Sequence, residues 1–177
     1  MGRDRELAEL LAGLEDAAGG RRRLFLIAGE PGIGKTWLAE HLAGHATRRG
    51  ARVLWGRCWE AGGAPPFWPW TQVIRALTED RDEQTLAAWL GAGAAQVAQL
   101  VPDLAERLGM TAPPLVASRE SEAARFYLFE AVSGFLEQAA SVEPLLLVFD
   151  DLHAADDPPC CCCSSWRETF AVQGCWW

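Results

Sequence analysis

Apolar residues recur at two spacings along the chain, and the spacing separates expected helices from expected strands. Over Asp4–Ala18 the apolar positions follow the i, i+3, i+4, i+7 pattern of an amphipathic helix, and two glycines end it. The residues that carry this pattern are Leu7, Leu10, Leu11 and Leu14. A second helix is expected from about Lys35 to Arg49, with Leu38 and Leu42 on one face.

Three short apolar runs predict strands instead. They cover residues 24–28 (LFLIA), 52–55 (RVLW) and 145–149 (LLLVF). The first and last are continuous apolar runs bounded by turn residues, which is typical of strands buried on both faces. Strands that alternate with helices predict an α/β domain with a mainly parallel sheet.

Between the second and third runs the sequence predicts a loop and then several helices. Residues 61–70 (AGGAPPFWPW) are expected to form a loop over its own aromatic side chains, because proline is excluded from helix interiors. Helical patterns follow at about 71–79, 84–91 and 94–108. The strongest pattern covers 119–140, where one face carries Leu128, Val132, Phe135, Leu136 and Ala139.

The segment Gly29–Thr36 (GEPGIGKT) carries the clearest chemistry. It matches G-x-x-x-x-G-K-[ST] in full, with a predicted strand before it and a predicted helix after it. Its glycines allow successive N–H groups to point at phosphate oxygens, and the helix N-terminus adds partial positive charge. Glu30 and Ile33 fill positions that need no particular side chain. The expected nucleotide-binding residues are Gly29, Glu30, Pro31, Gly32, Ile33, Gly34, Lys35 and Thr36.

Two side chains of this loop have more specific expected roles. Lys35 is the only lysine among 16 basic residues, and it would supply an ammonium to the β- and γ-phosphates. The hydroxyl of Thr36 can ligate magnesium. The expected cofactors are therefore ATP and Mg²⁺.

A pair of carboxylates follows the third apolar run. Strand 145–149 would place Asp150 and Asp151 at the carboxyl edge of the sheet, where ligands of such folds bind. One carboxylate can hold magnesium, which we assign to Asp150, and the second can orient a water for attack on the γ-phosphate, which we assign to Asp151. Thr36 and Asp150 are thus the expected metal ligands, and Lys35 and Asp151 the expected catalytic residues.

The three histidines are weaker candidates. His153 could contact the phosphate end of a nucleotide, and an exposed loop histidine fits equally well. His41 and His45 have the i, i+4 spacing of a helical metal pair, but no third ligand is visible in the sequence. We therefore interpret both as residues of a helix surface.

Composition and charge limit the kinds of molecule that this chain is expected to bind. The formal net charge of -8 does not favour direct contact with nucleic acid or with an anionic membrane. The longest apolar runs are too short to cross a bilayer, and the N-terminus lacks the apolar segment of a secretory signal. We expect a cytoplasmic domain whose partner is a nucleotide, and self-association stays open.

Three segments together resemble a known family. They are residues 2–7 (GRDREL), the loop GEPGIGKT and residues 144–158 (PLLLVFDDLHAADDP). They are similar to the AAA-related ATPase domain at the front of large bacterial LuxR-type regulators, which belong to the STAND class of signalling NTPases. The resemblance covers roughly residues 1–158. It implies a P-loop NTPase three-layer sandwich and places Arg3 and Glu6 near the nucleotide.

The last residues have a different character. Five of the six cysteines lie in 159–177 (PCCCCSSWRETFAVQGCWW), yet a four-ligand zinc site is incomplete because only Cys175 and no histidine follow Cys160–Cys163. With GC-rich codons, the neighbouring reading frame encodes a leucine-rich helix, a glycine and the start of a strand. We therefore predict a partial ATPase domain at 1–158 and an out-of-frame tail at 159–177.

The resemblance places the family's next strand between the phosphate-loop strand and the acidic strand. We accordingly expect a sheet that is incomplete at the C-terminus, with its middle strand missing. The leading functional hypothesis is ATP binding with magnesium, and slow hydrolysis, as the nucleotide switch of a signalling regulator.

Three alternatives compete with this hypothesis. A small-molecule or nucleotide kinase should carry a basic lid, but the arginines between the motifs are scattered, at Arg75, Arg81, Arg107, Arg119 and Arg125. A Ras-type GTPase recognises guanine with an Asn-Lys-x-Asp loop. This chain has no such loop, because its only lysine, Lys35, lies in the phosphate loop. A non-functional gene fragment stays open.

Overall fold

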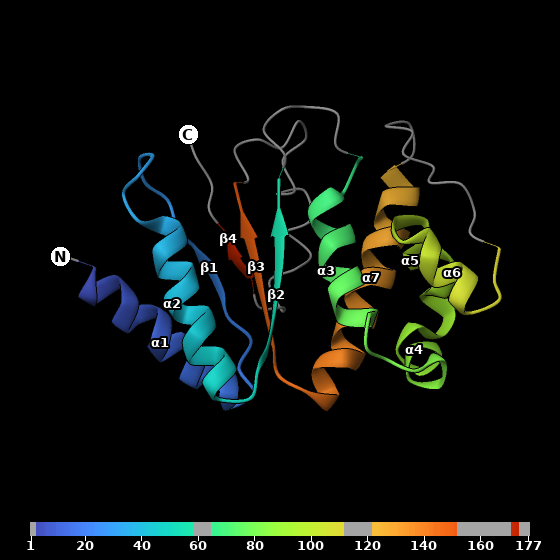
Figure 1. The fold of residues 1–177 in the computed structure, drawn as a ribbon, viewed down its shortest axis with the longest axis horizontal. Helices are drawn as coiled ribbons and strands as arrows, with labels where there is room; N and C mark the ends of the chain where they lie inside the picture. Colours follow the sequence, from blue (N-terminus) through green and yellow to red (C-terminus); the bar gives the residue numbers. More distant parts are fainter. Residues whose placement is uncertain (1–2, 59–64, 112–121, 152–170, 174–177) are drawn as a thin grey trace. The chain divides into compact units, whose positions relative to one another are not determined.

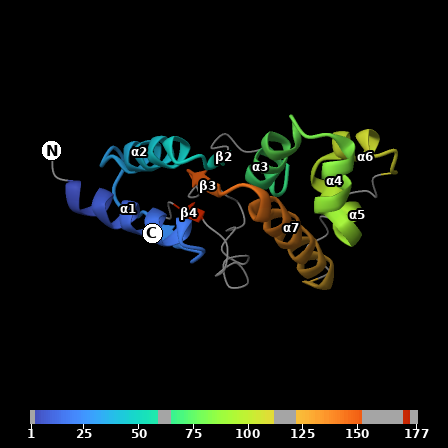
Figure 2. The same cartoon turned by 90° about the horizontal axis from the view of Figure 1, so that it is seen from below.

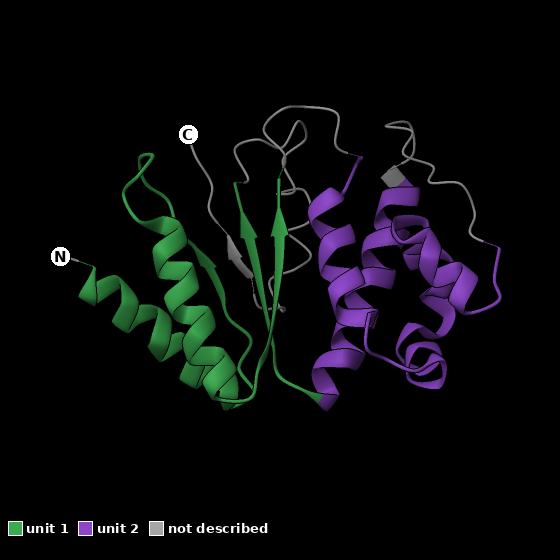
Figure 3. Cartoon of the chain, in the orientation of Figure 1, with its two compact units in different colours: residues 1–64, 143–177 green, residues 65–142 purple. Residues whose placement is uncertain are grey.

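The computed structural model describes residues 3–58, 65–111, 122–151 and 171–173. The chain divides into two compact units (Figure 3). Unit 1 comprises residues 1–64 and 143–177, and unit 2 comprises residues 65–142. The two segments of the candidate site, the phosphate loop and the acidic pair, both belong to unit 1.

Unit 1 is an α/β fold with a parallel sheet, as the sequence predicts (Figure 1). Its described helices are α1 (Asp4–Ala18) and α2 (Lys35–Arg48). Its strands are β1 (Leu24–Leu26), β2 (Arg52–Arg57), β3 (Leu145–Asp150) and β4 (Ala171–Gln173), and they lie in the order β1-β4-β3-β2. All three neighbouring pairs are parallel.

The expectation that the middle of this sheet is missing was wrong. β4 lies between β1 and β3 and pairs with both, with Val172 opposite Phe25 on one side and Val148 on the other. A ladder needs only extended backbone, since its hydrogen bonds come from N–H and C=O groups. The out-of-frame origin of 159–177 stays a prediction, and Cys160–Cys163 and Cys175 lie outside the described residues.

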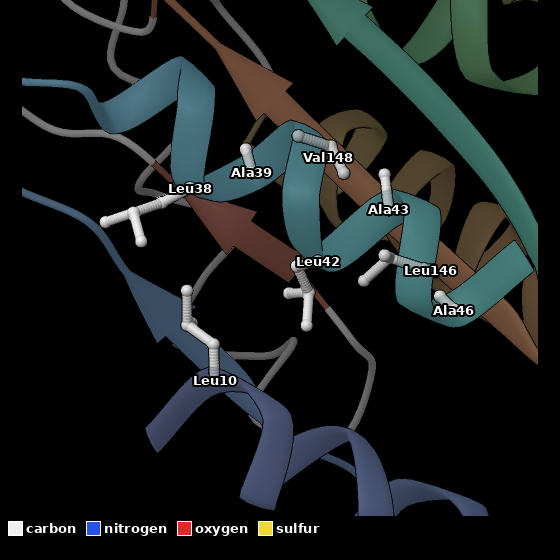
Figure 4. Packing of buried hydrophobic residues seen from close by; sticks show 8 residues of the cluster. All are labelled: Leu10, Leu38, Ala39, Leu42, Ala43, Ala46, Leu146 and Val148. Atoms are coloured by element: carbon white, nitrogen blue, oxygen red, sulfur yellow. The ribbon is translucent and has the colours of Figure 1, made fainter. Parts of the chain in front are cut away.

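The core of unit 1 forms where α2 packs against β3 and α1 (Figure 4). Leu38 and Leu42 of α2 are almost fully buried, as predicted, and Leu10 of α1 joins the same cluster. Three alanines of α2, at positions 39, 43 and 46, face the same cluster as Leu146 and Val148 of β3. Small side chains let the helix lie close to the strand, which fixes the start of α2 beside the end of β3.

The two apolar runs predicted to be buried on both faces behave differently. All five residues of 145–149 are buried, which confirms that prediction for β3. The prediction was wrong for 24–28, because the side chains of Leu24 and Leu26 are 39% and 59% exposed. Phe25 packs against the core cluster, so β1 buries one face only.

Unit 2 is helical. Its elements are α3 (Trp68–Thr78), α4 (Glu83–Leu90), the short 3₁₀ helix η1 (Gly91–Gly93), α5 (Ala94–Leu100), α6 (Pro102–Arg107) and α7 (Glu122–Val142). α4, η1 and α5 pack against α7, which Figures 1 and 2 show from two directions. The predicted apolar face of α7 is confirmed, since all five of its residues are buried. No helix in the described ranges is long and apolar enough to span a membrane.

Two predictions for unit 2 were wrong in detail. The single helix expected at 94–108 is two helices, because the extended Val101 is followed by Pro102, which starts α6. Trp68 and Trp70, expected in a loop, lie in the first turn of α3, where Pro69 is tolerated because its missing N–H has no helical partner there. Residues 61–64 of that predicted loop lie outside the described ranges.

The pairing of β4 generates a test. In Val172→Pro the strand loses a backbone donor in the middle of the sheet, so we expect a loss of about 2 kcal/mol or more in the free energy of unfolding. Val172→Ala keeps the N–H group and is the matched control. Urea unfolding followed by circular dichroism measures both variants. Equal stability of the two would show that these backbone groups do not hold the sheet together.

Candidate functional site

The loop between β1 and α2 is shaped by a tight turn. The N–H of Ile33 donates to the carbonyl oxygen of Glu30 at 3.3 Å, with Pro31 and Gly32 at the two central positions. Proline followed by a glycine with positive φ, here 76°, is the pattern of a type II turn. Glu30 and Ile33, which sequence reasoning treated as filler, are therefore the two ends of this turn.

The loop leads into α2 through Gly34, which is the N-cap residue with a φ of 95°. No side chain caps this helix, and its first internal bond runs from the N–H of Leu38 to the carbonyl of Gly34 at 3.1 Å. The amides of the turn before Leu38 therefore lack partners within the helix. An uncapped N-terminus with partial positive charge is suited to a phosphate group.

Gly29 closes the other side of the loop. Its φ is 154°, and a Cβ placed there would come within 3.0 Å of Cγ2 of Ile33. The side chain of Ile33 thus lies against the first residue of the loop. A larger residue at position 29 would both strain the backbone and push Ile33 away, so the glycine expected from the motif has a local steric reason.

Lys35 folds back over the loop. Its Nζ donates to the carbonyl oxygens of Gly29 and Glu30, at 3.1 Å each. The ammonium is thus held by two carbonyl oxygens at the start of the loop. A cation at this position can exchange these neutral acceptors for charged phosphate oxygens, which form stronger hydrogen bonds.

The structure brings Thr36 and Asp150 together, as predicted. Oγ1 of Thr36 donates to Oδ2 of Asp150 at 3.1 Å, across 114 positions of sequence. Adjacent ligands of an octahedral magnesium ion lie about 2.9 Å apart, given metal–oxygen distances of about 2.0–2.1 Å. The observed spacing and the hard oxygen donors therefore fit a magnesium ion held between the loop and β3.

The two carboxylates of the acidic pair are placed differently. Oδ1 of Asp150 accepts a hydrogen bond from the N–H of Asp151 at 3.0 Å, so both oxygens of Asp150 have partners. Asp151 follows the last residue of β3 and has a φ of 56°, in the left-handed region that aspartate tolerates better than most residues. The backbone at Asp151 therefore departs from the extended conformation of β3 directly after Asp150.

Cys58 adjoins the acidic pair, and sequence reasoning missed it. Its N–H donates to the carbonyl oxygen of Asp150 at 3.2 Å, one residue beyond the end of β2. Burial, together with the negative charges of Asp151 and Asp150, raises the pKa of the Cys58 thiol to about 11. No sequence pattern indicates this approach, because it follows from the parallel register of β2 and β3, which sets Arg57 opposite Asp150.

The family model of the AAA ATPase domain matches residues 1–159. The chain belongs to the AAA ATPase domain family. No curated protein and no solved structure matches it. The matched range contains both the phosphate loop and the acidic pair. Membership implies nucleotide binding and ATPase activity, with ATP and Mg²⁺ as the cofactors that the family generally uses.

Other predicted site residues of this AAA ATPase domain are not brought to the loop by any described contact. Arg3 pairs with Glu6 at 3.9 Å, so its support of the nucleotide stays a prediction. His41 is exposed on α2 as expected, and the described residues contain no group of three or more metal-binding side chains of the histidine, cysteine or acidic types. His153 lies outside the described ranges.

Two arginines considered for a kinase lid have structural partners within unit 2. Arg107 donates to the carbonyl oxygens of Thr78 and Arg81, at 2.9 and 2.6 Å. Arg75 forms an ion pair with Asp103 at 3.4 Å. These contacts tie α3 to α6 and explain both side chains without a ligand.

The raised pKa of Cys58 predicts slow alkylation. A thiol with a pKa of about 11 instead of 9.0 has about 100-fold less thiolate near pH 8, and the thiolate is the reactive form. We expect iodoacetamide to label Cys58 about 100-fold more slowly in the folded chain than in urea, with a rate that rises tenfold per pH unit up to pH 9.5. Mass spectrometry of the peptide that contains Cys58 separates it from the other cysteines. A plateau below pH 9.5 would contradict the assigned shift.

Proposed function

We propose that this AAA ATPase domain binds ATP with magnesium through Gly29–Thr36 and hydrolyses it slowly, as the nucleotide switch of a signalling or transcriptional regulator. The observation that carries the proposal is the hydrogen bond of 3.1 Å between Thr36 and Asp150. It joins the two motifs expected to share one metal ion.

Binding rests first on the loop. The turn Glu30–Ile33 and the positive φ of Gly34 give the loop a compact backbone whose amides could bind phosphate oxygens, and the uncapped start of α2 adds its partial charge. Lys35 supplies a full positive charge to the terminal phosphates after it leaves the carbonyls of Gly29 and Glu30. The loop thus recognises a polyphosphate through geometry and charge together.

Thr36 and Asp150 would hold the magnesium ion, which supplies charge neutralisation at the phosphates when bound. Their present hydrogen bond keeps both oxygens oriented toward each other. Asp151 has the separate role of accepting a hydrogen bond from the attacking water, and of accepting its proton as bond formation proceeds. The left-handed backbone of Asp151, which directly follows the extended Asp150 at the end of β3, is consistent with separate roles for the two residues.

The switch role is supported by sequence features beyond the loop. Residues 2–7 and the segment around Asp150 and Asp151 resemble the AAA-related domain of LuxR-type regulators of the STAND class. In such proteins nucleotide state controls signalling, so slow hydrolysis suits the task better than rapid turnover. Arg3, with its partner Glu6, would support the nucleotide from the start of α1.

The phosphate-loop assignment predicts a loss of affinity in Lys35→Ala. Removal of the only full positive charge in the loop should weaken ATP binding in the presence of magnesium at least tenfold, or about 1.4 kcal/mol. Isothermal titration calorimetry measures the affinity. Arg49→Ala is the matched control, because Arg49 is an exposed cation at the end of α2 away from the loop. Equal affinity of the Lys35→Ala variant and the unmodified chain would refute the assignment.

The division of roles between the carboxylates predicts two distinct phenotypes. In Asp150→Asn the gain in ATP affinity on adding magnesium should fall at least tenfold, because a charged oxygen ligand is lost. In Asp151→Asn the affinity should stay within about twofold, while hydrolysis falls at least tenfold because the water loses its acceptor. Calorimetry with and without magnesium and phosphate release under single-turnover conditions separate the two. Matching effects on affinity and rate would show that the roles are wrongly divided.

A further inference from the structure

Two large apolar side chains flank the phosphate loop without being buried. Ile33 in the loop is 46% exposed, and Trp37 in the first turn of α2 is 44% exposed. The other face of the same helix, with Leu38 and Leu42, fills the core. Trp37 is not part of this core cluster, and it lies one residue after Thr36, in the first turn of the helix that follows the loop.

The ring of Trp37 is held in place by His41. The two ring centroids are 3.7 Å apart with an interplanar angle of 35°. Nδ1 of His41 also lies 2.9 Å from the carbonyl oxygen of Trp37, where it acts as the donor because a carbonyl can only accept. Contacts on the ring and on the backbone thus fix His41, and His41 in turn supports one side of the indole.

A purely structural role explains little of this arrangement. Side-chain pairs at i, i+4 on a helix surface contribute only about 0.2–0.5 kcal/mol to helix stability, and smaller side chains would serve as well. A large aromatic ring left partly in water is better explained by a ligand that covers it. The nearest ligand is the one proposed for the loop itself.

We infer that Trp37, supported by His41, is the surface on which the base of the bound nucleotide stacks. The inference rests on the proposed function, since the triphosphate must first occupy Gly29–Thr36. Lys35, Thr36 and Asp150 fix the terminal phosphates and magnesium, so the ribose and base must extend beyond the loop. Trp37 is the exposed aromatic residue that directly follows these groups in the described first turn of α2.

The chemistry of the two rings suits a base. Every nucleobase presents a flat π face, and stacking on an aromatic side chain contributes to binding without a requirement for specific hydrogen bonds. Such a contact adds affinity for the nucleoside and none for the phosphates. The loop alone would bind any polyphosphate. With Trp37, the site would bind a nucleotide more tightly than a polyphosphate that has no base.

The test compares two ligands that share the phosphates. Calorimetry with magnesium measures the affinity of the unmodified chain and of Trp37→Ala for ATP and for inorganic tripolyphosphate. We expect Trp37→Ala to weaken ATP binding at least fivefold, the lower end of what one stacked base contributes, and to change tripolyphosphate binding less than twofold. Trp37→Phe should recover most of the ATP affinity. Tyr127→Ala, which removes an aromatic ring that is 62% exposed in unit 2, is the control and should change neither affinity.

The outcomes separate this inference from the function on which it rests. If the unmodified chain binds neither ligand, both the proposed function and the proposed stacking surface are wrong. Binding of both ligands with an equal loss for both in Trp37→Ala would show that Trp37 only supports the loop, and this would overturn the inference alone. An unchanged ATP affinity in Trp37→Ala would also overturn it and leave the phosphate site intact.

Discussion

The hydrogen bond from Thr36 to Asp150 joins segments that are 114 positions apart, and the candidate site depends on it. Its two residues stand at the start of α2 and at the end of β3. They meet because the alanines and leucines of α2 pack directly against Leu146 and Val148. A bulkier residue at Ala39 or Ala43 would push the helix outward and separate the hydroxyl from the carboxylate. The core of unit 1 therefore sets the spacing of the expected metal ligands.

The strand order places a second condition on the site. β1 carries the phosphate loop and β3 carries the acidic pair, and β4 lies between them and pairs with both. Without a strand at that position, β1 and β3 would be connected only through their contacts with α2. In parallel sheets, ligands bind beyond the carboxyl ends of the strands, and here the loop follows the end of β1 and Asp150 is the last residue of β3. The β4 ladder thus supports the same geometry from the sheet side.

The sequence predicts well those features that depend on the residue pattern within one helix or strand, and poorly those that depend on which elements become neighbours. The helix Asp4–Ala18 and the buried face of α7 follow from spacing within one element, and both predictions are confirmed. The exposure of Leu26 and the approach of Cys58 to Asp150 depend on which elements lie next to a strand, and no pattern within the strand encodes that. The meeting of Thr36 and Asp150 was predictable only because strand ends of parallel sheets converge at one edge. The turn Glu30–Ile33 was predictable from Pro31 and Gly32, which is the residue pattern of a type II turn. The shape of the loop had instead been explained by its glycines.

The charge balance limits how such a site can work. A chain with a formal charge of -8 repels a polyphosphate over its surface as a whole. At physiological ionic strength, salt largely screens this repulsion at distances beyond about 8 Å. Attraction must therefore come from groups in contact with the ligand, and the loop has one full cation, Lys35, together with backbone amides. Asp150 and Asp151 add negative charge at the same place, so a bare triphosphate would meet opposing forces there. A divalent ion between Thr36 and Asp150 would turn one of those carboxylates from a repulsive neighbour into a ligand, so the proposed site would need magnesium for its electrostatics as well as for its chemistry.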